Sequence, residues 1–160
     1  MRLIVMSDSH SAFHKVKTIV EANKDTADTF IHLGDGVEEF EDVHSLYPQL
    51  HFIAVKGNND WGSMEPKTRI ITSFGKRIVL THGDIYNVKY STKDLEEAAR
   101  KEKADIVLYG HTHYAQVGYL EDGLYIINPG SVLDSRYTPC SYLCLDLTPA
   151  GVVPNIREIK

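Results

Sequence analysis

Five short apolar runs constrain the fold of this chain more than any other feature, because each is followed by a cluster of Asp, His or Asn side chains. The runs, which have the composition of buried strands, are Leu3–Met6, Phe30–Ile31, Phe52–Val55, Ile78–Leu80 and Ile106–Leu108. The clusters that follow them are Asp8-Ser9-His10, Gly34-Asp35, Gly57-Asn58-Asn59-Asp60, His82-Gly83 and Gly110-His111-Thr112-His113. Strands that end in this way deliver polar side chains to the carboxyl edge of a sheet, where open α/β sheets bind ligands. We therefore expect the five clusters to converge on one crevice.

The side chains in these clusters are a mixed set of imidazole, carboxylate and amide donors. Such a set suits manganese, iron, zinc or nickel better than calcium or magnesium. The candidate metal ligands are Asp8, His10, Asp35, Asn58, His82, His111 and His113. Seven ligands are too many for one tetrahedral ion and fit two ions that share a carboxylate. The pattern therefore predicts a two-metal hydrolase.

Taken alone, most of these clusters have a simpler explanation. Asp8 is typical of loops, Asp35 of a helix cap, and residues 57–60 of a turn. The pair His111 and His113 is the most specific signal, because two histidines at this spacing after a buried strand are rare in mere packing. The remaining histidines are interpreted as structural or solvated, and His32, inside the second strand, is the one closest to a cluster.

Composition sets the limits within which this chemistry operates. The 160 residues carry a formal net charge of -5 and have no basic stripe, so no extended nucleic-acid surface is expected. The length predicts one domain over residues 1–160. No apolar stretch approaches the roughly 18–20 residues of a membrane span, and the amino terminus leaves no room for a signal peptide. Cys140 and Cys144 lie too far apart on one strand for a disulfide, so we expect buried thiols and a cytoplasmic location.

The order of the predicted elements indicates the fold class. Helical spacing over Phe13–Asn23, over Val37–Leu46 and over Leu95–Lys103 alternates with strands, and hairpins dominate from Thr68 onward. In the second helix the inward positions are Val37, Phe40, Val43 and Leu46, and the outward positions are Glu38, Glu39, Glu41 and Asp42. Parallel βα units followed by hairpins predict an α/β protein in which two mixed sheets pack together with helices outside.

The clusters, read in order as D-x-H, G-D, G-N-x-D, H-G and G-H-x-H, resemble the calcineurin-like metallophosphoesterase superfamily. Asn128-Pro129-Gly130-Ser131 is similar to the sequence that follows the last block in small members. The length, with no cap domain, resembles the small bacterial and archaeal phosphodiesterase branch, which is related to the eukaryotic retromer subunit of the same fold. The resemblance implies a four-layer α/β/β/α sandwich.

The resemblance also implies two divalent metal ions, with manganese first and nickel, iron, zinc or magnesium as alternatives. Carried over by motif, the ligands of the first metal would be Asp8, His10, Asp35 and His113, and those of the second Asp35, Asn58, His82 and His111. Many members have a His after the metal-binding Asn, where this chain has Asn59. An amide can position a phosphate but cannot protonate a leaving group. Asn59 and His111 are therefore expected to help bind the reacting phosphate, and Asp60 to support the site without orienting a His.

The function predicted from these residues is a metal-dependent phosphodiesterase that hydrolyses a small phosphodiester by attack of a metal-bridging hydroxide. A phosphomonoesterase or nucleotidase is an alternative within the same chemistry, and a non-catalytic scaffold like the retromer subunit is an alternative from another class. The intact ligand set favours an enzyme. A homo-oligomer is compatible with the sequence. Substrate choice would depend on three loops, whose residue types indicate no particular substrate. These loops are Trp61–Lys67, Val88–Lys93 and Leu133–Thr138.

Overall fold

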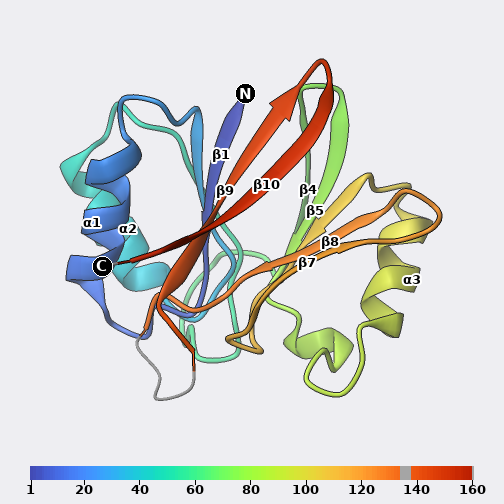
Figure 1. Cartoon of the computed structure of the whole chain (residues 1–160). Coiled ribbons are helices and arrows are strands. Elements are labelled where there is room, and N and C mark those ends of the chain that lie inside the picture. The colour runs from blue at the N-terminus through green and yellow to red at the C-terminus, as the bar shows by residue number, and fades with distance from the viewer. Residues whose placement is uncertain (134–137, 160) are drawn as a thin grey trace.

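The computed structural model describes residues 1–133 and 138–159, and their strands form two sheets that pack against each other (Figure 1). The first sheet has the order β10-β9-β1-β2-β3, formed by β10 (Gly151–Glu158), β9 (Ser141–Thr148), β1 (Arg2–Met6), β2 (Thr29–His32) and β3 (Phe52–Ala54). The second has the order β4-β5-β6-β8-β7, formed by β4 (Thr68–Ser73), β5 (Lys76–Thr81), β6 (Ile106–Leu108), β8 (Tyr125–Pro129) and β7 (Ala115–Tyr119). Residues 134–137, within the predicted substrate loop 133–138, lie outside the described residues.

Both sheets mix parallel and antiparallel pairs. β1, β2 and β3 run parallel, with Ile4 opposite Phe30, whereas β9 and β10 join antiparallel. In the second sheet β5, β6 and β8 run parallel between the antiparallel edge strands β4 and β7. The segments that follow β1, β2, β3, β5 and β6 meet at the lower end of the sandwich in Figure 1. The prediction of two mixed sheets is confirmed.

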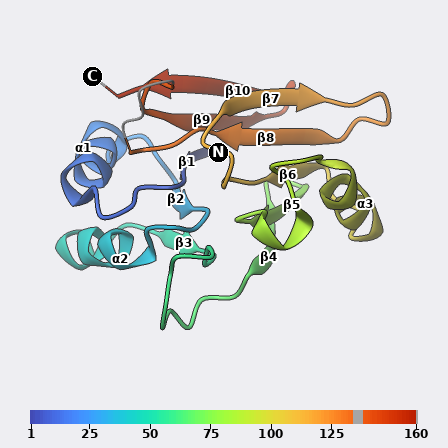
Figure 2. The same cartoon turned by 90° about the horizontal axis from the view of Figure 1, so that it is seen from below.

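Helices cover the outer faces of the two sheets. Figure 2 shows α1 (Phe13–Asn23) and α2 (Val37–Leu46) on one side and α3 (Lys93–Lys101) on the other. The 3-10 helix η1 (Asp84–Tyr86) follows β5. β1 is apolar at every position from Leu3 to Met6 because both of its faces are buried. Leu3 and Val5 belong to the core between the sheets, while Ile4 and Met6 pack in the layer of α1 and α2. These layers form the α/β/β/α arrangement.

The structure corrects two positions of α2 and the bounds of α3. Glu39, predicted to face outward, is buried at 7% exposure, because it accepts hydrogen bonds from the Ser9 hydroxyl and the Ser11 amide. Leu46, predicted to face inward, is 54% exposed at the last residue of the helix. The third helix begins and ends two residues before the predicted Leu95–Lys103.

Two further expectations concern the cysteines and membrane spans. Cys140 and Cys144 are both free and buried, as predicted. Among the described residues, no helix is both long enough and apolar enough to cross a membrane.

Candidate metal centre

Three of the predicted ligands form a first cluster at the ends of β1 and β6, consisting of Asp8, His10 and His113. The Nε2 atom of His113 lies 3.1 Å from Oδ1 of Asp8, and that of His10 lies 3.8 Å from the same oxygen. The two imidazole Nε2 atoms are 3.3 Å apart. One carboxylate oxygen and two ring nitrogens therefore converge within the reach of a single cation.

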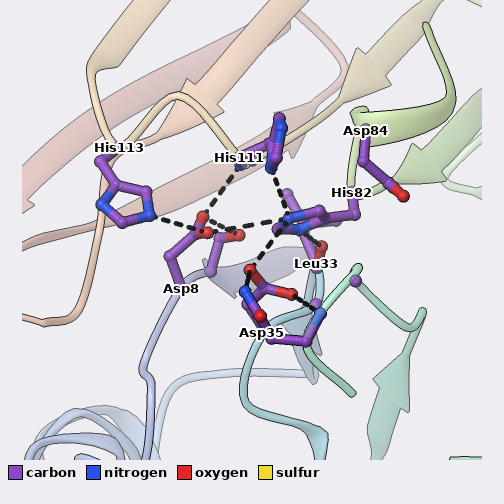
Figure 3. Close-up of polar contacts among 12 residues, drawn as sticks. Asp8, Leu33, Asp35, His82, Asp84, His111 and His113 are labelled. Carbon is purple, nitrogen blue, oxygen red and sulfur yellow. Dashed lines mark hydrogen bonds and ion pairs between the residues drawn. The ribbon is translucent and has the colours of Figure 1, made fainter. Parts of the chain in front are cut away.

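Three more predicted ligands form a second cluster at the ends of β2, β5 and β6, consisting of Asp35, His82 and His111. The Nε2 atom of His82 lies 3.4 Å from Oδ2 of Asp35 and 3.1 Å from Nδ1 of His111. Figure 3 shows the three side chains pointing toward one another, with Asp8 of the first cluster beside them. These atoms form a second group of donors next to the first.

Asp35 connects the two clusters. Its Oδ2 atom lies 3.4 Å from Nε2 of His82 and 3.9 Å from Nε2 of His10. The structure thus brings together six of the seven predicted ligands. The seventh, Asn58, is an exposed residue of the loop after β3, and its part as a ligand stays a prediction.

The backbone holds these ligands in an unusual conformation. Asp8, Asp35, His111 and His113 have φ angles of 55°, 56°, 69° and 64°, in the left-handed region that residues with a Cβ rarely adopt. His10 has a φ of 41°. Each such residue costs of order 1–3 kcal/mol, so surrounding contacts must fix it. Two backbone bonds of 3.0 Å, from Asp8 N–H to Gly34 C=O and from His10 N–H to Asp35 C=O, join the first loop to the turn after β2.

One glycine brings the backbone against a ligand. A Cβ atom on Gly57 would lie 2.1 Å from Oδ1 of Asp35, far inside van der Waals contact. Gly57 therefore lets the end of β3 approach the Asp35 carboxylate closely. This approach also allows Asn59 to reach Asp35 with two donors, its backbone N–H to Oδ1 and its Nδ2 to Oδ2, each at 2.8 Å.

The electrostatics of the centre keep both carboxylates ionised. Burial would raise the pKa of Asp8, but the contact with His113 and the charge of His82 lower it below its ordinary value. Burial would also raise the pKa of Asp35, but its contacts with His82 and Asn59 bring that pKa well below its usual range. Two buried carboxylates that remain charged are well suited to hold cations.

The pKa values of the two histidines of the second cluster are shifted in opposite directions. Burial lowers the pKa of His82, yet the carboxylates of Asp35 and Asp8 outweigh burial and raise it. Burial lowers the pKa of His111, and the charge of His82 lowers it further. The His82 Nδ1 atom lies 2.8 Å from the carbonyl oxygen of Leu33, which can only accept. Nδ1 therefore carries a proton, and Nε2 is the atom that can bind a cation.

A buried oxygen of Asp8 indicates whether a metal ion fits these residues. Oδ1 of Asp8 is buried and has no hydrogen-bond partner among the described residues; Oδ1 of Asp84 is the other described side-chain atom of this kind. Leaving a charged oxygen unpaired in the interior costs free energy. Oδ1 of Asp8 faces the ring nitrogens of His10 and His113, so a cation bound there would pair it. The donor set and this oxygen both fit a divalent metal.

Asp60 supports the centre through the backbone. Its carboxylate accepts from the backbone N–H groups of Asp35 and Gly57, both at 2.7 Å, and from those of Gly36 and Val37 at 2.9 and 3.0 Å. Burial raises the pKa of Asp60, and these four hydrogen bonds lower it below the ordinary value. Asp60 thus caps α2 and joins the Asp35 turn to the end of β3, which makes it a positioning residue.

Two residues that the sequence analysis left without a role hold the ligand loops. Asn128 is buried and donates from Nδ2 to the carbonyl of Gly110 and to the hydroxyl of Thr112, at 3.0 and 3.1 Å. Ser131 donates its hydroxyl to the carbonyl of Asp8 at 2.9 Å. Both belong to Asn128-Pro129-Gly130-Ser131, so the signal for them was that motif.

A cavity of about 590 Å³ opens beside the two clusters. Its lining includes His10, Asp35 and Asn59. Glu38, Glu41 and Trp61 also line it, and Trp61 is 88% exposed. A small ester could therefore enter beside the candidate metal centre.

Residues 1–149 match the calcineurin-like phosphoesterase superfamily domain, and the chain belongs to this family. The protein named Phosphodiesterase MJ0936, from Methanocaldococcus jannaschii, is 30% identical over 89% of this chain and 87% of its own length. Vacuolar protein sorting-associated protein 29 of Schizosaccharomyces pombe is 38% identical over 72% of this chain and 68% of its own. A crystal structure of a conserved protein from Streptococcus pneumoniae TIGR4 has a TM-score of 0.78 at 23% identity, covering 98% of this chain and 97% of that one. At that identity the likeness shows the fold.

Proposed function

We propose that this protein is a metal-dependent phosphodiesterase that hydrolyses a small phosphodiester with two divalent cations. The observation that carries the proposal is the pair of adjoining Asp and His clusters connected through Asp35. Membership of the phosphoesterase superfamily and the relative named phosphodiesterase support it. Two such cations, when bound, would supply an activated water and neutralise the charge of the phosphate.

The residues of the chain would hold and orient that reaction. Asp8 and Asp35 stay ionised and so offer charged oxygens, while the Leu33 carbonyl keeps Nε2 of His82 directed at the centre. Asn59 lines the cavity and has no acidic proton, so it can orient a phosphate oxygen without protonating the leaving group. His111 completes the second cluster, with its Nδ1 atom 3.1 Å from Nε2 of His82.

The charge of the cavity favours a diester over a monoester. Its lining includes Glu38 and Glu41, and no Lys or Arg among the described residues lines it. Burial raises the pKa of Glu41, and the neighbouring carboxylates raise it further, so this wall already carries crowded negative charge. A monoester dianion would meet more repulsion here than a diester monoanion.

The test is an assay of metal-depleted protein with bis(4-nitrophenyl) phosphate and 4-nitrophenyl phosphate, each with manganese, nickel, iron, zinc or magnesium added back. We expect diester hydrolysis only with added metal, and slower cleavage of the monoester. His113→Asn should lose this activity, whereas His14→Asn, on the exposed face of α1, should keep it. Turnover by metal-free protein, or a preference for the monoester, would contradict the proposal.

The similarity to vacuolar protein sorting-associated protein 29 favours a second candidate, a non-catalytic interaction domain. The edge strand β7 fits that function, because Val117 and Tyr119 are 45% and 65% exposed there. Two-metal occupancy without turnover of any phosphoester would support this candidate. We also infer a reducing compartment such as the cytoplasm, since both described cysteines are free thiols.

A further inference from the structure

A buried chain of hydrogen bonds runs behind the first cluster and includes no metal-ligand side chain. It begins at His32 on β2, passes through Ser9 and ends at Glu39 on α2. The Nε2 atom of His32 lies 2.9 Å from the Ser9 hydroxyl oxygen, which lies 2.6 Å from Oε1 of Glu39. His32 and Ser9 are fully buried and Glu39 is 7% exposed.

The direction of every bond in this chain is fixed. The Gly34 N–H donates to Nδ1 of His32 at 3.1 Å, so Nδ1 carries a lone pair. Burial lowers the pKa of His32 to about 4, so the ring is neutral and its proton is on Nε2. Nε2–H therefore donates to Ser9, and the single hydroxyl proton of Ser9 donates to Glu39. Glu39 accepts a second bond from the backbone N–H of Ser11, at 2.7 Å.

The hydrogen-bond chain contacts both segments that carry the ligands. Ser9 stands between Asp8 and His10, and Gly34 directly precedes Asp35. Space for the chain is kept by Gly36, where a Cβ atom would lie 1.8 Å from the Ser9 hydroxyl oxygen. The ligands on both sides have left-handed backbone angles, a conformation that persists only where several contacts determine it.

We propose that His32, Ser9 and Glu39 form a positioning relay that holds the loop of Asp8 and His10 against the turn of Asp35 and against α2. The relay thereby sets how tightly the first cluster binds its metal. This inference rests on the proposed function in one respect, the presence of metal at the first cluster. It assigns a role to three residues that are not among the candidate metal ligands, of which Glu39 also lines the cavity.

The experiment compares Ser9→Ala with Thr29→Val. Thr29 lies on the same strand as His32, at the opposite end, and its hydroxyl pairs with Nδ1 of His51 at 3.1 Å. Each variant removes one hydroxyl that contacts a histidine, so Thr29→Val is a control for such a loss at the far end of β2. Stepwise Mn²⁺ binding is measured by calorimetry. Ser9→Ala should weaken one of the two binding steps by about 10-fold, the lower end of the effect of losing an outer partner of a metal site, and Thr29→Val should change neither.

A second pair of variants keeps the test decisive if Ser9→Ala does not fold. Glu39→Gln retains an oxygen that can accept both hydrogen bonds, and should bind Mn²⁺ as the parent does. Glu39→Leu removes the acceptor and should weaken the same binding step as Ser9→Ala. Equal affinities in Glu39→Gln and Glu39→Leu, or equal losses in Ser9→Ala and Thr29→Val, would overturn the relay.

A measurement without metal separates this inference from the proposed function. In metal-free protein, hydrogen exchange at the amides of Asp8 and His10 should be faster in Ser9→Ala than in the parent, and unchanged in Thr29→Val. The ¹⁵N spectrum of His32 should show the proton on Nε2. Unchanged exchange would reject the relay. Faster exchange in a protein whose parent binds no metal would reject the proposed function and leave the relay in place.

Discussion

The first and second clusters contain the same kinds of residue but differ in how firmly the protein holds them. In the second cluster His82 is fully buried, its Nδ1 is fixed on the Leu33 carbonyl, and two donors from Asn59 fix Asp35. In the first cluster the side chains of His10 and His113 are 25% and 36% exposed. The second cluster therefore contains an imidazole that is buried and fixed in orientation, whereas both imidazoles of the first cluster are partly exposed.

The largest effect expected from this comparison is on chelation. Removal of metal should abolish phosphodiester hydrolysis, because no residue of the site can replace the charge of two cations. Loss of metal should occur in two steps, the first cluster emptying before the second, since both imidazoles of the first cluster are partly exposed whereas His82 of the second is buried. Chelator titration with parallel activity and elemental analysis measures both. A single concerted loss would show that the clusters are equally held.

Among single substitutions, Asp35→Asn should be the most damaging. Asp35 contacts His82 of the second cluster and His10 of the first, so the variant weakens both positions. Activity should fall by more than the ~100-fold that marks the upper range for an outer partner of a metal site. Asp8→Asn is the matched comparison, because Oδ1 of Asp8 contacts His10 and His113 and also lies 3.9 Å from Nε2 of His82; its loss of activity should be smaller. If Asp35→Asn retains two metals and near-normal turnover, Asp35 does not connect the clusters.

Asn59→His should change the response to the leaving group. The amide of Asn59 now donates to Asp35, and a His would introduce a group able to protonate a departing oxygen. General acid catalysis is typically worth about 10²–10⁴-fold, so a partial gain of about 10-fold for basic leaving groups is expected. Rates plotted against leaving-group pKa for both proteins measure it. Equal slopes would show that residue 59 has no part in leaving-group departure.

Asp60→Asn should lower stability more than it alters chemistry. An amide offers one acceptor oxygen where the carboxylate accepts from four backbone N–H groups. The loss should be about 3 kcal/mol, since hydrogen bonds to a charged group contribute roughly 1.5–3 kcal/mol each. Urea unfolding of the metal-free proteins gives the value. A change below about 1 kcal/mol would show that the Asp35 turn is held by other contacts.

The last prediction concerns the pH dependence of stability that His32 produces. The folded pKa of His32 is about 4, below the ordinary 6.5, so the unfolded chain binds the extra proton between these values. Stability from this group is therefore complete above about pH 6.5 and is lost as the pH falls toward 4. Glu39, Asp60 and Asp8 oppose the shift, and His82 adds to it. In His32→Gln the slope of unfolding free energy against pH should decrease by up to about 1.4 kcal/mol per pH unit in this window. An unchanged slope would mean that His32 titrates normally.

Local patterns in the sequence were enough to predict the strands and the chemistry at their ends. Apolar runs such as Leu3–Met6 are read locally, and polar residues directly after them must lie at the ends of strands. The choice of Asp and His at those points already indicated metal ligands. Six candidate ligands therefore meet where the sequence analysis expected one crevice.

The pairing of the ligands and the side chains that support them could not be predicted from local patterns. Helical periodicity placed Glu39 on the outer face of α2, but Ser9, 30 residues earlier, makes its burial favourable. No local pattern reveals that Asn59 donates to Asp35 or that Asp60 accepts from four backbone groups. The spacing of residues along the sequence determines which of them share a face of a helix or strand. The hydrogen-bond partners of a buried polar group depend on segments that only the packed sheets bring together.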